Sequence, residues 1–90
     1  MIQYAVAPNH ISSELSGEVV ILNHKEGVYY NLDEVGAVIW QALQTQPQTA
    51  EALAQTVLSQ FDVTPEVCRA DLQALLDDLV KEKIVVENIS

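Results

Sequence analysis

Four residues in the second half of the chain have the chemistry and spacing of a peptide-binding helix face: Cys68, Asp71, Leu75 and Asp78. If this segment is helical and Leu72 centres its buried stripe, Cys68 and Leu75 lie about 40° to 60° to one side of Leu72. The two aspartates lie about 100° to 120° to the same side. Such a face would bury apolar side chains of an extended peptide, and its carboxylates would accept hydrogen bonds from basic groups or N–H donors. An ordinary solvated helix flank has the same pattern, so both interpretations stay open.

A short aromatic segment supplies a second candidate surface: Val28, Tyr29, Tyr30 and Asn31. These residue types suit a half-buried strand. If the strands pair in chain order, this strand lies at the sheet edge. Its free N–H and C=O groups can then pair with an extended peptide, or with a second copy in an edge-strand or swapped homodimer. The segment lacks the Lys, Pro or bulge that usually protects an edge, which favours binding. Alternation also places at least one tyrosine in the core, so packing explains part of the pattern.

The residues needed for catalysis are not present in a recognisable arrangement. His10 and His24 are the only histidines, and no serine or cysteine forms a known nucleophile motif with either. The glycines Gly17, Gly27 and Gly36 are scattered and form no phosphate-binding loop. We therefore expect a protein that is not an enzyme.

Metal and cofactor binding are also disfavoured. Asp71, Asp77 and Asp78 lack the loop of alternating oxygen ligands that a calcium site needs, and they suit a solvated helix face. Cys68 is the only cysteine, which excludes an intramolecular disulfide and a cysteine-rich zinc site. We expect no metal and no cofactor.

Length and charge restrict the class of partner. Ninety residues, 49% of them hydrophobic, predict a single domain over residues 1–90 with one modest core. Thirteen acidic residues against four basic ones give a net charge of −9, which repels nucleic acid and anionic lipid. No apolar run approaches the roughly 18 residues of a membrane span, and no secretory signal is recognisable. We expect a cytoplasmic protein whose partner is a protein or peptide, with no nucleic acid and no membrane.

The elements that position both candidate surfaces follow from turn signals and hydrophobic periodicity. Four extended segments are predicted: Ile2 to Val6, His10 to Leu15, Glu18 to Asn23 and Gly27 to Asn31. Turns at Ser16-Gly17 and at residues 24–27 make this region a β-meander. The continuous apolar run of residues 19–22 predicts the central strand of the sheet.

Three helices follow the strands. The first begins after the cap Asp33 and ends near Gln44, before Pro47; the second begins after Thr49 and ends near Gln60. The third has Thr64 as N-cap and Pro65 in its first position, and ends near Lys81 or Glu82. Ile84 to Val86 would close the chain as a short strand. The predicted fold is α+β and winged-helix-like, with a three-stranded antiparallel sheet followed by three helices.

A winged-helix fold also raises a DNA-binding alternative. The third helix offers only Arg69 before Lys81 and Lys83 at its end, and it carries three aspartates where a recognition helix needs hydrogen-bond donors. DNA binding is therefore the weaker hypothesis.

An ordered set of motifs makes most of the chain similar to one known family. These motifs are Gly17 to Leu22, Gly27 to Asp33, Gly36 with Ile39-Trp40, and Asp71 with Leu76 and Leu79. Together they resemble the PqqD-like family over about Val6 to Val86. Members of that family are RiPP recognition elements, small domains that bind the leader region of ribosomally made precursor peptides and present them to modifying enzymes.

The resemblance implies where a peptide would bind. In the family, the leader adds as an antiparallel strand to the third strand of the sheet and packs into a groove against the third helix. The matching positions here are the four strand residues 28–31 and the four helix residues named above. Leu32, Trp40, Leu76 and Leu79 match structural positions. Asp33 departs from the more usual asparagine, and both residues cap helices well.

The resemblance also implies a role and partners. A free-standing chain of this kind is most similar to the leader-binding proteins of lasso-peptide biosynthesis, which work with a separate leader protease. The expected function is a non-catalytic adaptor that binds a precursor peptide and delivers it to that protease or to another modifying enzyme. The alternative within the family is a peptide chaperone for a radical-enzyme pathway.

Overall fold

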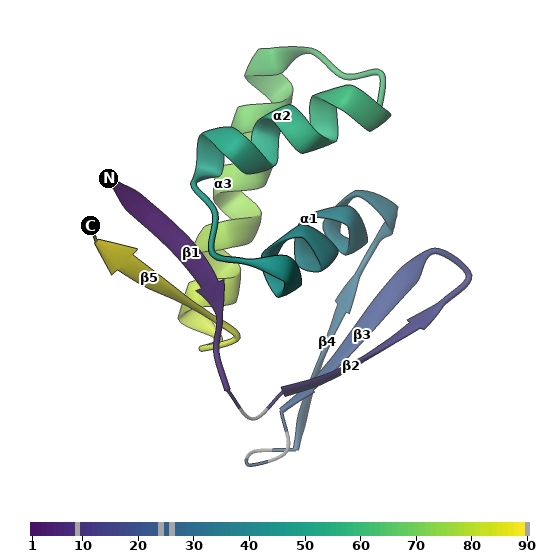
Figure 1. Ribbon diagram of the computed structural model, residues 1–90. Coiled ribbons are helices and arrows are strands. Elements are labelled where there is room, and N and C mark those ends of the chain that lie inside the picture. The colour runs from purple at the N-terminus through teal and green to yellow at the C-terminus, as the bar shows by residue number, and fades with distance from the viewer. Residues whose placement is uncertain (9, 24, 26, 90) are drawn as a thin grey trace.

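The structure is a computed structural model. It describes residues 1–8, 10–23, 25 and 27–89, and only the backbone of Val28. Five strands and three helices follow one another in the chain (Figure 1): β1 (Ile2–Val6), β2 (His10–Leu15), β3 (Glu18–Asn23), β4 (Val28–Leu32), α1 (Glu34–Thr45), α2 (Ala50–Gln60), α3 (Pro65–Lys81) and β5 (Val85–Ile89).

The main sheet is antiparallel and three-stranded, in the order β2-β3-β4. As predicted, β3 is the central strand and β4 an edge strand. Ser16 (φ 54°) and Gly17 (φ 81°) connect β2 to β3, and two positive φ angles are those that a two-residue hairpin favours. The predicted turn at residues 24–27 lies partly outside the described residues. The predicted sheet followed by three helices is confirmed.

One strand is not where the meander predicted it. β1 does not join β2; it pairs with β5 in a separate antiparallel sheet, from Ile2 opposite Ile89 to Val6 opposite Val85. The N–H of Tyr4 also donates to the carbonyl of Gln48 (2.7 Å), and the carbonyl of Tyr4 accepts a hydrogen bond from the N–H of Gln48 (3.0 Å). This pairing joins the two ends of the chain, and a short strand carries no local information about so distant a partner.

Each helix begins at its predicted cap. The side chain of Asp33 accepts a hydrogen bond from the N–H of Gly36 (2.9 Å), and Thr49 accepts one from Ala52 (3.1 Å). Thr64 caps α3 in the same way, at a longer 3.4 Å from the N–H of Val67. These oxygens satisfy backbone donors that the first turn of a helix leaves without partners.

The strand β4 passes directly into α1, with only Asp33 between them. This junction depends on Gly36, because a Cβ atom added there would lie 3.1 Å from both Cβ and Cδ2 of Leu32. Ordinary carbon contacts are about 3.5 to 4.0 Å. The last residue of the strand therefore packs against the bare backbone of the first helical turn.

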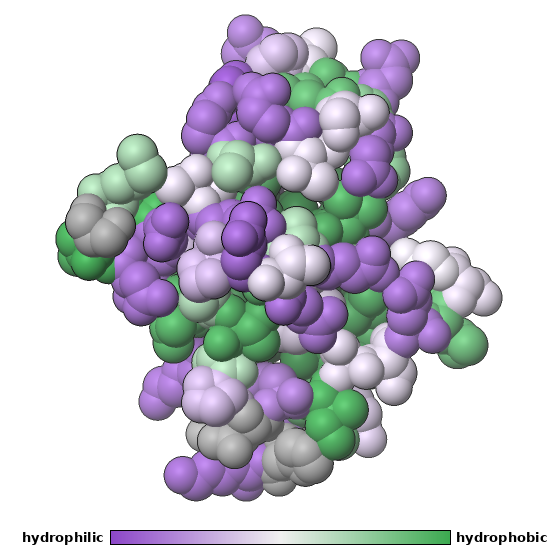
Figure 2. Space-filling view, viewed as in Figure 1, coloured by the Kyte–Doolittle hydropathy of each residue, from purple (hydrophilic) through white to green (hydrophobic). Residues whose placement is uncertain are grey.

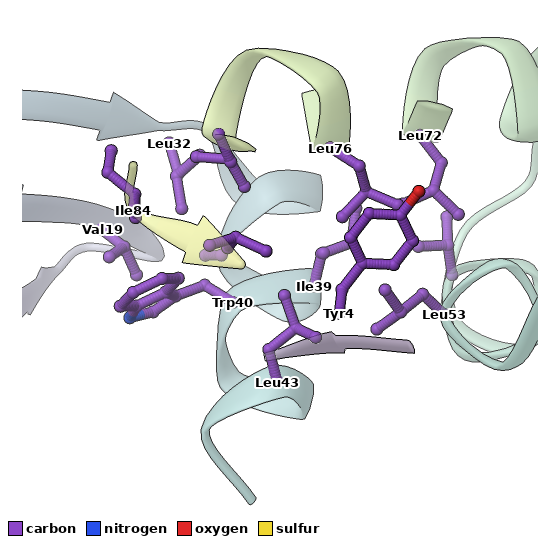
Figure 3. Packing of buried hydrophobic residues seen from close by; sticks show 14 of the residues in the cluster. Tyr4, Val19, Leu32, Ile39, Trp40, Leu43, Leu53, Leu72, Leu76 and Ile84 are labelled. Atoms are coloured by element: carbon purple, nitrogen blue, oxygen red, sulfur yellow. The ribbon is translucent and has the colours of Figure 1, made fainter. Parts of the chain in front are cut away.

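The core lies between the sheets and the helices. Trp40 of α1 is 1% exposed, and Leu32, Leu76 and Leu79 are also buried, as expected of structural positions. Figure 3 shows the Trp40 ring near Val19 at one end of the core, while the ring of Tyr4 fills the other end. The buried side chains of Ile39, Leu53 and Leu72 lie near Tyr4 in the same view (Figure 3).

Some apolar side chains remain at the surface. Figure 2 shows hydrophobic residues at the left, where β1 begins and β5 ends, and hydrophilic residues over much of α2. Ile2 and Ile89 are exposed at that end. Ile11, Leu15 and Tyr29 are exposed on strands of the main sheet. No helix among the described residues is long and apolar enough to cross a membrane.

Replacing Trp40 by alanine should lower the free energy of unfolding by about 3 to 5 kcal/mol, the usual cost of removing a buried large aromatic side chain. The whole free energy of unfolding of a small domain is only about 5 to 15 kcal/mol. Urea unfolding followed by circular dichroism measures the loss. As a control, Tyr29→Ala removes a ring that is 68% exposed and should cost about 1 kcal/mol or less. Similar losses in the two variants would contradict the assigned core.

Candidate peptide-binding site

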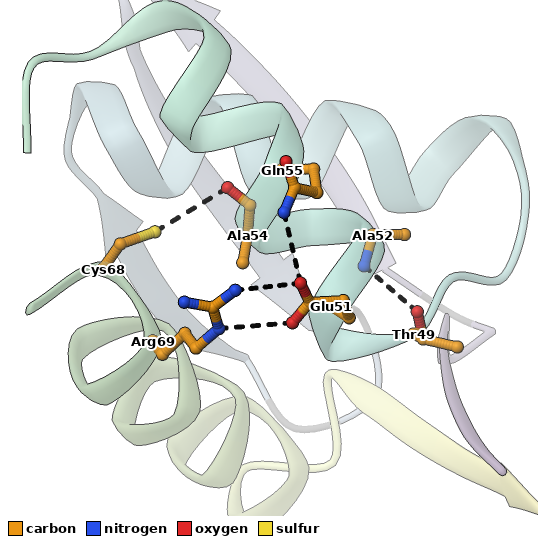
Figure 4. Close-up of polar contacts among 7 residues, drawn as sticks. All are labelled: Thr49, Glu51, Ala52, Ala54, Gln55, Cys68 and Arg69. Atoms are coloured by element: carbon orange, nitrogen blue, oxygen red, sulfur yellow. Dashed lines mark hydrogen bonds and ion pairs between the residues drawn. The ribbon is translucent and has the colours of Figure 1, made fainter. Parts of the chain in front are cut away.

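The helix α3 is fixed against α2 by contacts near its N-terminal end (Figure 4). Arg69 donates two hydrogen bonds to Glu51, at 2.9 and 3.2 Å, and Gln55 donates a third to the same carboxylate. The hydrogen bonds from Arg69 hold the pKa of Glu51 below its usual value. In the buried part of the same interface, the thiol of Cys68 lies 3.8 Å from the carbonyl oxygen of Ala54. These contacts orient α3 against α2 and so determine which side of α3 is left open to a ligand.

That remaining side forms one wall of a groove with a volume of about 390 Å³. The groove is at the lower end of the range for ligand pockets, about 300 to 1,000 Å³. Its lining residues come from the start of α1, from α2 and from α3 with the residue Val63 before it: Asp33, Val35, Gly36, Ile39, Val57, Val63, Val67, Cys68, Asp71, Leu72, Ala74 and Leu75. Most of this surface is apolar, with two carboxylates.

Three predicted residues of α3 line the groove. Leu75 is half-buried and Asp71 is exposed, so both can contact a ligand. Cys68 is 5% exposed and faces Ala54. Its side chain is packed in the core, and it contributes to the floor of the groove.

The fourth residue of α3, Asp78, already has a partner from the strand. The hydroxyl of Tyr30 donates a hydrogen bond of 2.6 Å to its carboxylate. Burial raises the pKa of Tyr30 to about 12, and the hydrogen bond to Asp78 and the negative charges of Asp78 and Glu82 act in the same direction. The phenol is therefore neutral at physiological pH, and it ties the edge strand to the helix.

The other strand residues lie at the edge of the sheet. Side chains alternate between the faces of a strand, so Tyr30 and the buried Leu32 face the helices. Tyr29 and Asn31 are exposed on the opposite face. Val28 belongs to β4, and its side chain is not described. Because β4 has a strand neighbour on one side only within the part of the chain that the structure describes, alternate N–H and C=O groups along its other side are available for pairing.

The sequence predicts a peptide that pairs with residues 28–31 and packs against the third helix. In the structure, the groove that α3 lines has the start of α1 as its other wall. Tyr30 and Asp78 lie beyond the end of the groove, joined to each other. Residues 28–31 and the groove are thus neighbouring surfaces.

Several groove residues were not found from the sequence. Val67 and Ala74 could have been found, because Val67 is four residues before Asp71 and Ala74 is three residues after it, the spacings that place residues on one helix face. No sequence signal indicates the α1 residues, because the meeting of α1 with α3 depends on tertiary packing.

The fold and the site together define a small α+β domain with an open strand edge beside an apolar groove. The family model that matches the sequence, over residues 18–85, is described as coenzyme PQQ synthesis protein D (PqqD). The chain belongs to this family, and the predicted resemblance to it is confirmed.

Two solved structures have the same fold. One, described as TbiB1 in complex with the TbiA(beta) leader peptide, is 25% identical, with a TM-score of 0.82, and the match covers 90% of this chain and 93% of that one. The other, described as lasso peptide synthetase B1 complexed with the leader peptide, is 21% identical, with a TM-score of 0.78 and coverage of 92% and 96%. A comparison with curated proteins finds no match.

The tyrosine contact predicts a measurable titration. Tyr30 should keep its proton through pH 10 and lose it near pH 12. Since this pKa is above the unfolded value of 10.0, the stability that the neutral phenol contributes is present below pH 10 and is lost as the pH rises toward 12. The phenolate absorbance of the wild type minus that of Tyr30→Phe isolates this group. A midpoint near pH 10 would be inconsistent with the contact, and Asp78→Asn should lower the midpoint.

Proposed function

We propose that this protein is a non-catalytic adaptor that captures the leader region of a ribosomally made precursor peptide. The leader adds as an antiparallel strand to β4 and buries an apolar side chain in the groove between α1 and α3. The adaptor then presents the precursor to a leader protease or another modifying enzyme. The single observation that carries this proposal is the position of an unpaired strand edge next to an apolar groove.

The free energies involved explain why a peptide needs both the β4 edge and the groove. A net backbone hydrogen bond contributes about 0.5 to 1.5 kcal/mol, so about four of them supply roughly 4 kcal/mol. Association itself costs an estimated 4 kcal/mol or more, so strand pairing alone gives little affinity. Burying one large apolar side chain adds about 1.5 to 3 kcal/mol. The groove residues around Leu75 would therefore decide both affinity and specificity.

The relatives support this proposal. The solved protein that is 25% identical is described as a complex with a leader peptide, and the family contains PqqD. Lasso-peptide biosynthesis is the proposed pathway, because the motifs of this chain are most similar to the leader-binding proteins of such pathways. We further propose that residues 1–90 act as one domain, and that the protein acts in the cytoplasm, where ribosomes release the precursor.

The unpaired edge also bears on self-association. In the absence of leader, β4 of one copy could pair with β4 of another, because the same N–H and C=O groups are available to both partners. Peptide and homodimer would then compete for the edge. The homodimer remains a prediction of the sequence, and added peptide should convert it to monomer.

The proposal is tested by selecting binders from a displayed library of linear peptides on the immobilised protein, followed by NMR titration of the best one. Selected peptides should shift amide signals of β4 and of the α3 residues that line the groove. Methylating alternate backbone nitrogens of the peptide should weaken binding, because each methyl group removes an N–H donor from the added strand. Absence of enrichment over bare resin, or shifts confined to other surfaces, would overturn strand addition at β4.

Two substitutions locate the groove in that complex. Leu75→Asp should weaken peptide binding at least tenfold in titration calorimetry, since it places a charge where an apolar side chain is buried. Ala74→Glu, at an exposed residue that also lines the groove, should weaken it without disturbing the core. The matched control is Gln73→Glu, which adds a negative charge at an exposed position that does not line the groove, about 160° around α3 from Leu75. Unchanged affinity for both groove variants would exclude the groove from the site.

A further inference from the structure

The groove lies beyond one end of β4 and not alongside it. Tyr30, in the middle of the strand, contacts Asp78, whereas Asp33, just after the strand, lines the groove together with Asp71. From Tyr30 to Asp33 the chain of β4 runs toward its C-terminal end, whereas the neighbouring positions on α3 change from Asp78 to Asp71, about two helical turns toward the N-terminus of α3. The two elements run in opposite directions, as Figure 1 also shows.

This arrangement fixes which part of a bound peptide reaches the groove. The inference rests on the proposed function, in which the peptide is antiparallel to β4. Such a peptide runs in the same direction as α3. Its residues that precede the strand-paired segment then reach the groove, and those that follow it pass toward Val28.

The groove end of this path carries negative charge. Among the described residues that line it, Asp33 and Asp71 are the only carboxylates, and none is Lys, Arg or His. Asp71 is exposed and has no hydrogen bond or ion pair with the described residues. Asp33 uses one oxygen, Oδ1, to cap α1. The nearest cation on α3, Arg69, is held by Glu51 at 2.9 Å.

The helix dipole does not cancel this charge. The N-terminus of α1 points toward the groove with an effective charge of about +0.5, which is smaller than the two carboxylates combined. A cation at the groove therefore meets a net attraction. With a chain charge of −9, long-range attraction acts in the same direction.

We propose that the groove selects leaders in which a bulky apolar residue and an adjacent lysine or arginine stand immediately N-terminal to the strand-forming segment. The apolar side chain is buried against Val67 and Leu75. The cation pairs with Asp71 at the surface of the groove, with the second oxygen of Asp33 beside it. An exposed ion pair of this kind contributes about 0.2 to 1 kcal/mol, which corresponds to roughly 1.4-fold to fivefold in affinity.

The test uses three synthetic versions of the best peptide from the library selection. The first has lysine before the strand-forming segment, the second has norleucine at that position, and the third has the lysine moved to the other side of the segment. Each is titrated into wild type, into Asp71→Asn and into Asp77→Asn. The last variant is the matched control, because Asp77 is an exposed carboxylate of α3 that contacts Gln73 and does not line the groove.

The first peptide should bind wild type about 1.4-fold to fivefold more tightly than the norleucine peptide. The advantage should disappear in Asp71→Asn, persist in Asp77→Asn, and shrink as salt is raised. The third peptide should gain nothing from its lysine. Equal binding of the first two peptides to wild type, or equal effects of the two variants, would overturn the inference.

The same titrations separate the two proposals. If the norleucine peptide binds as well as the lysine peptide and still shifts the β4 amide signals, the charge preference is wrong and strand addition stands. If none of the three peptides shifts those signals, the proposed function itself fails.

Discussion

The close approach of Leu32 to Gly36 is the constraint on which the rest of the structure depends. Because no side chain separates them, the chain turns from strand to helix within one residue, and Asp33 can cap α1 immediately. A longer connection would let the strand and the helix move relative to each other. The short connection fixes the position of the β4 edge relative to the first turns of α1. Because those turns line the groove, the edge and the groove also have a fixed relative position.

The remaining contacts hold α3 in the position that this junction requires. Arg69 and Glu51 fix its N-terminal half to α2, and Tyr30 and Asp78 fix its C-terminal half to β4. Both pairs are near the surface, where individual ion pairs and hydrogen bonds contribute modestly. Their main effect is to fix the orientation of α3. The buried apolar contacts of Leu72, Leu76 and Leu79 are not directional and would by themselves allow α3 to rotate or slide slightly. The flank of α3 with Asp71 and Leu75 is exposed to a ligand as a result.

Local signals were enough to predict most elements and part of the candidate site. The caps Asp33, Thr49 and Thr64 marked the helices because a cap acts on residues only three positions away. The continuous apolar run in β3 identified the central strand, because it is a property of a few consecutive residues and can be read locally. The pairing of β1 with β5, and the use of α1 as a groove wall, could not be read in this way. Each brings together residues that are far apart in the chain, and several alternative partners have the same local pattern.

The pairing of β1 with β5 also determines where the chain ends lie. Ile2 is opposite Ile89, so both ends emerge together at one corner, on the far side of the helices from the three-stranded sheet (Figure 1). A polypeptide joined to either end would leave the domain away from β4 and need not cover the edge. The same geometry makes the fold suited to genetic fusion at both ends at once, with the inserted domain held by a short, antiparallel stem.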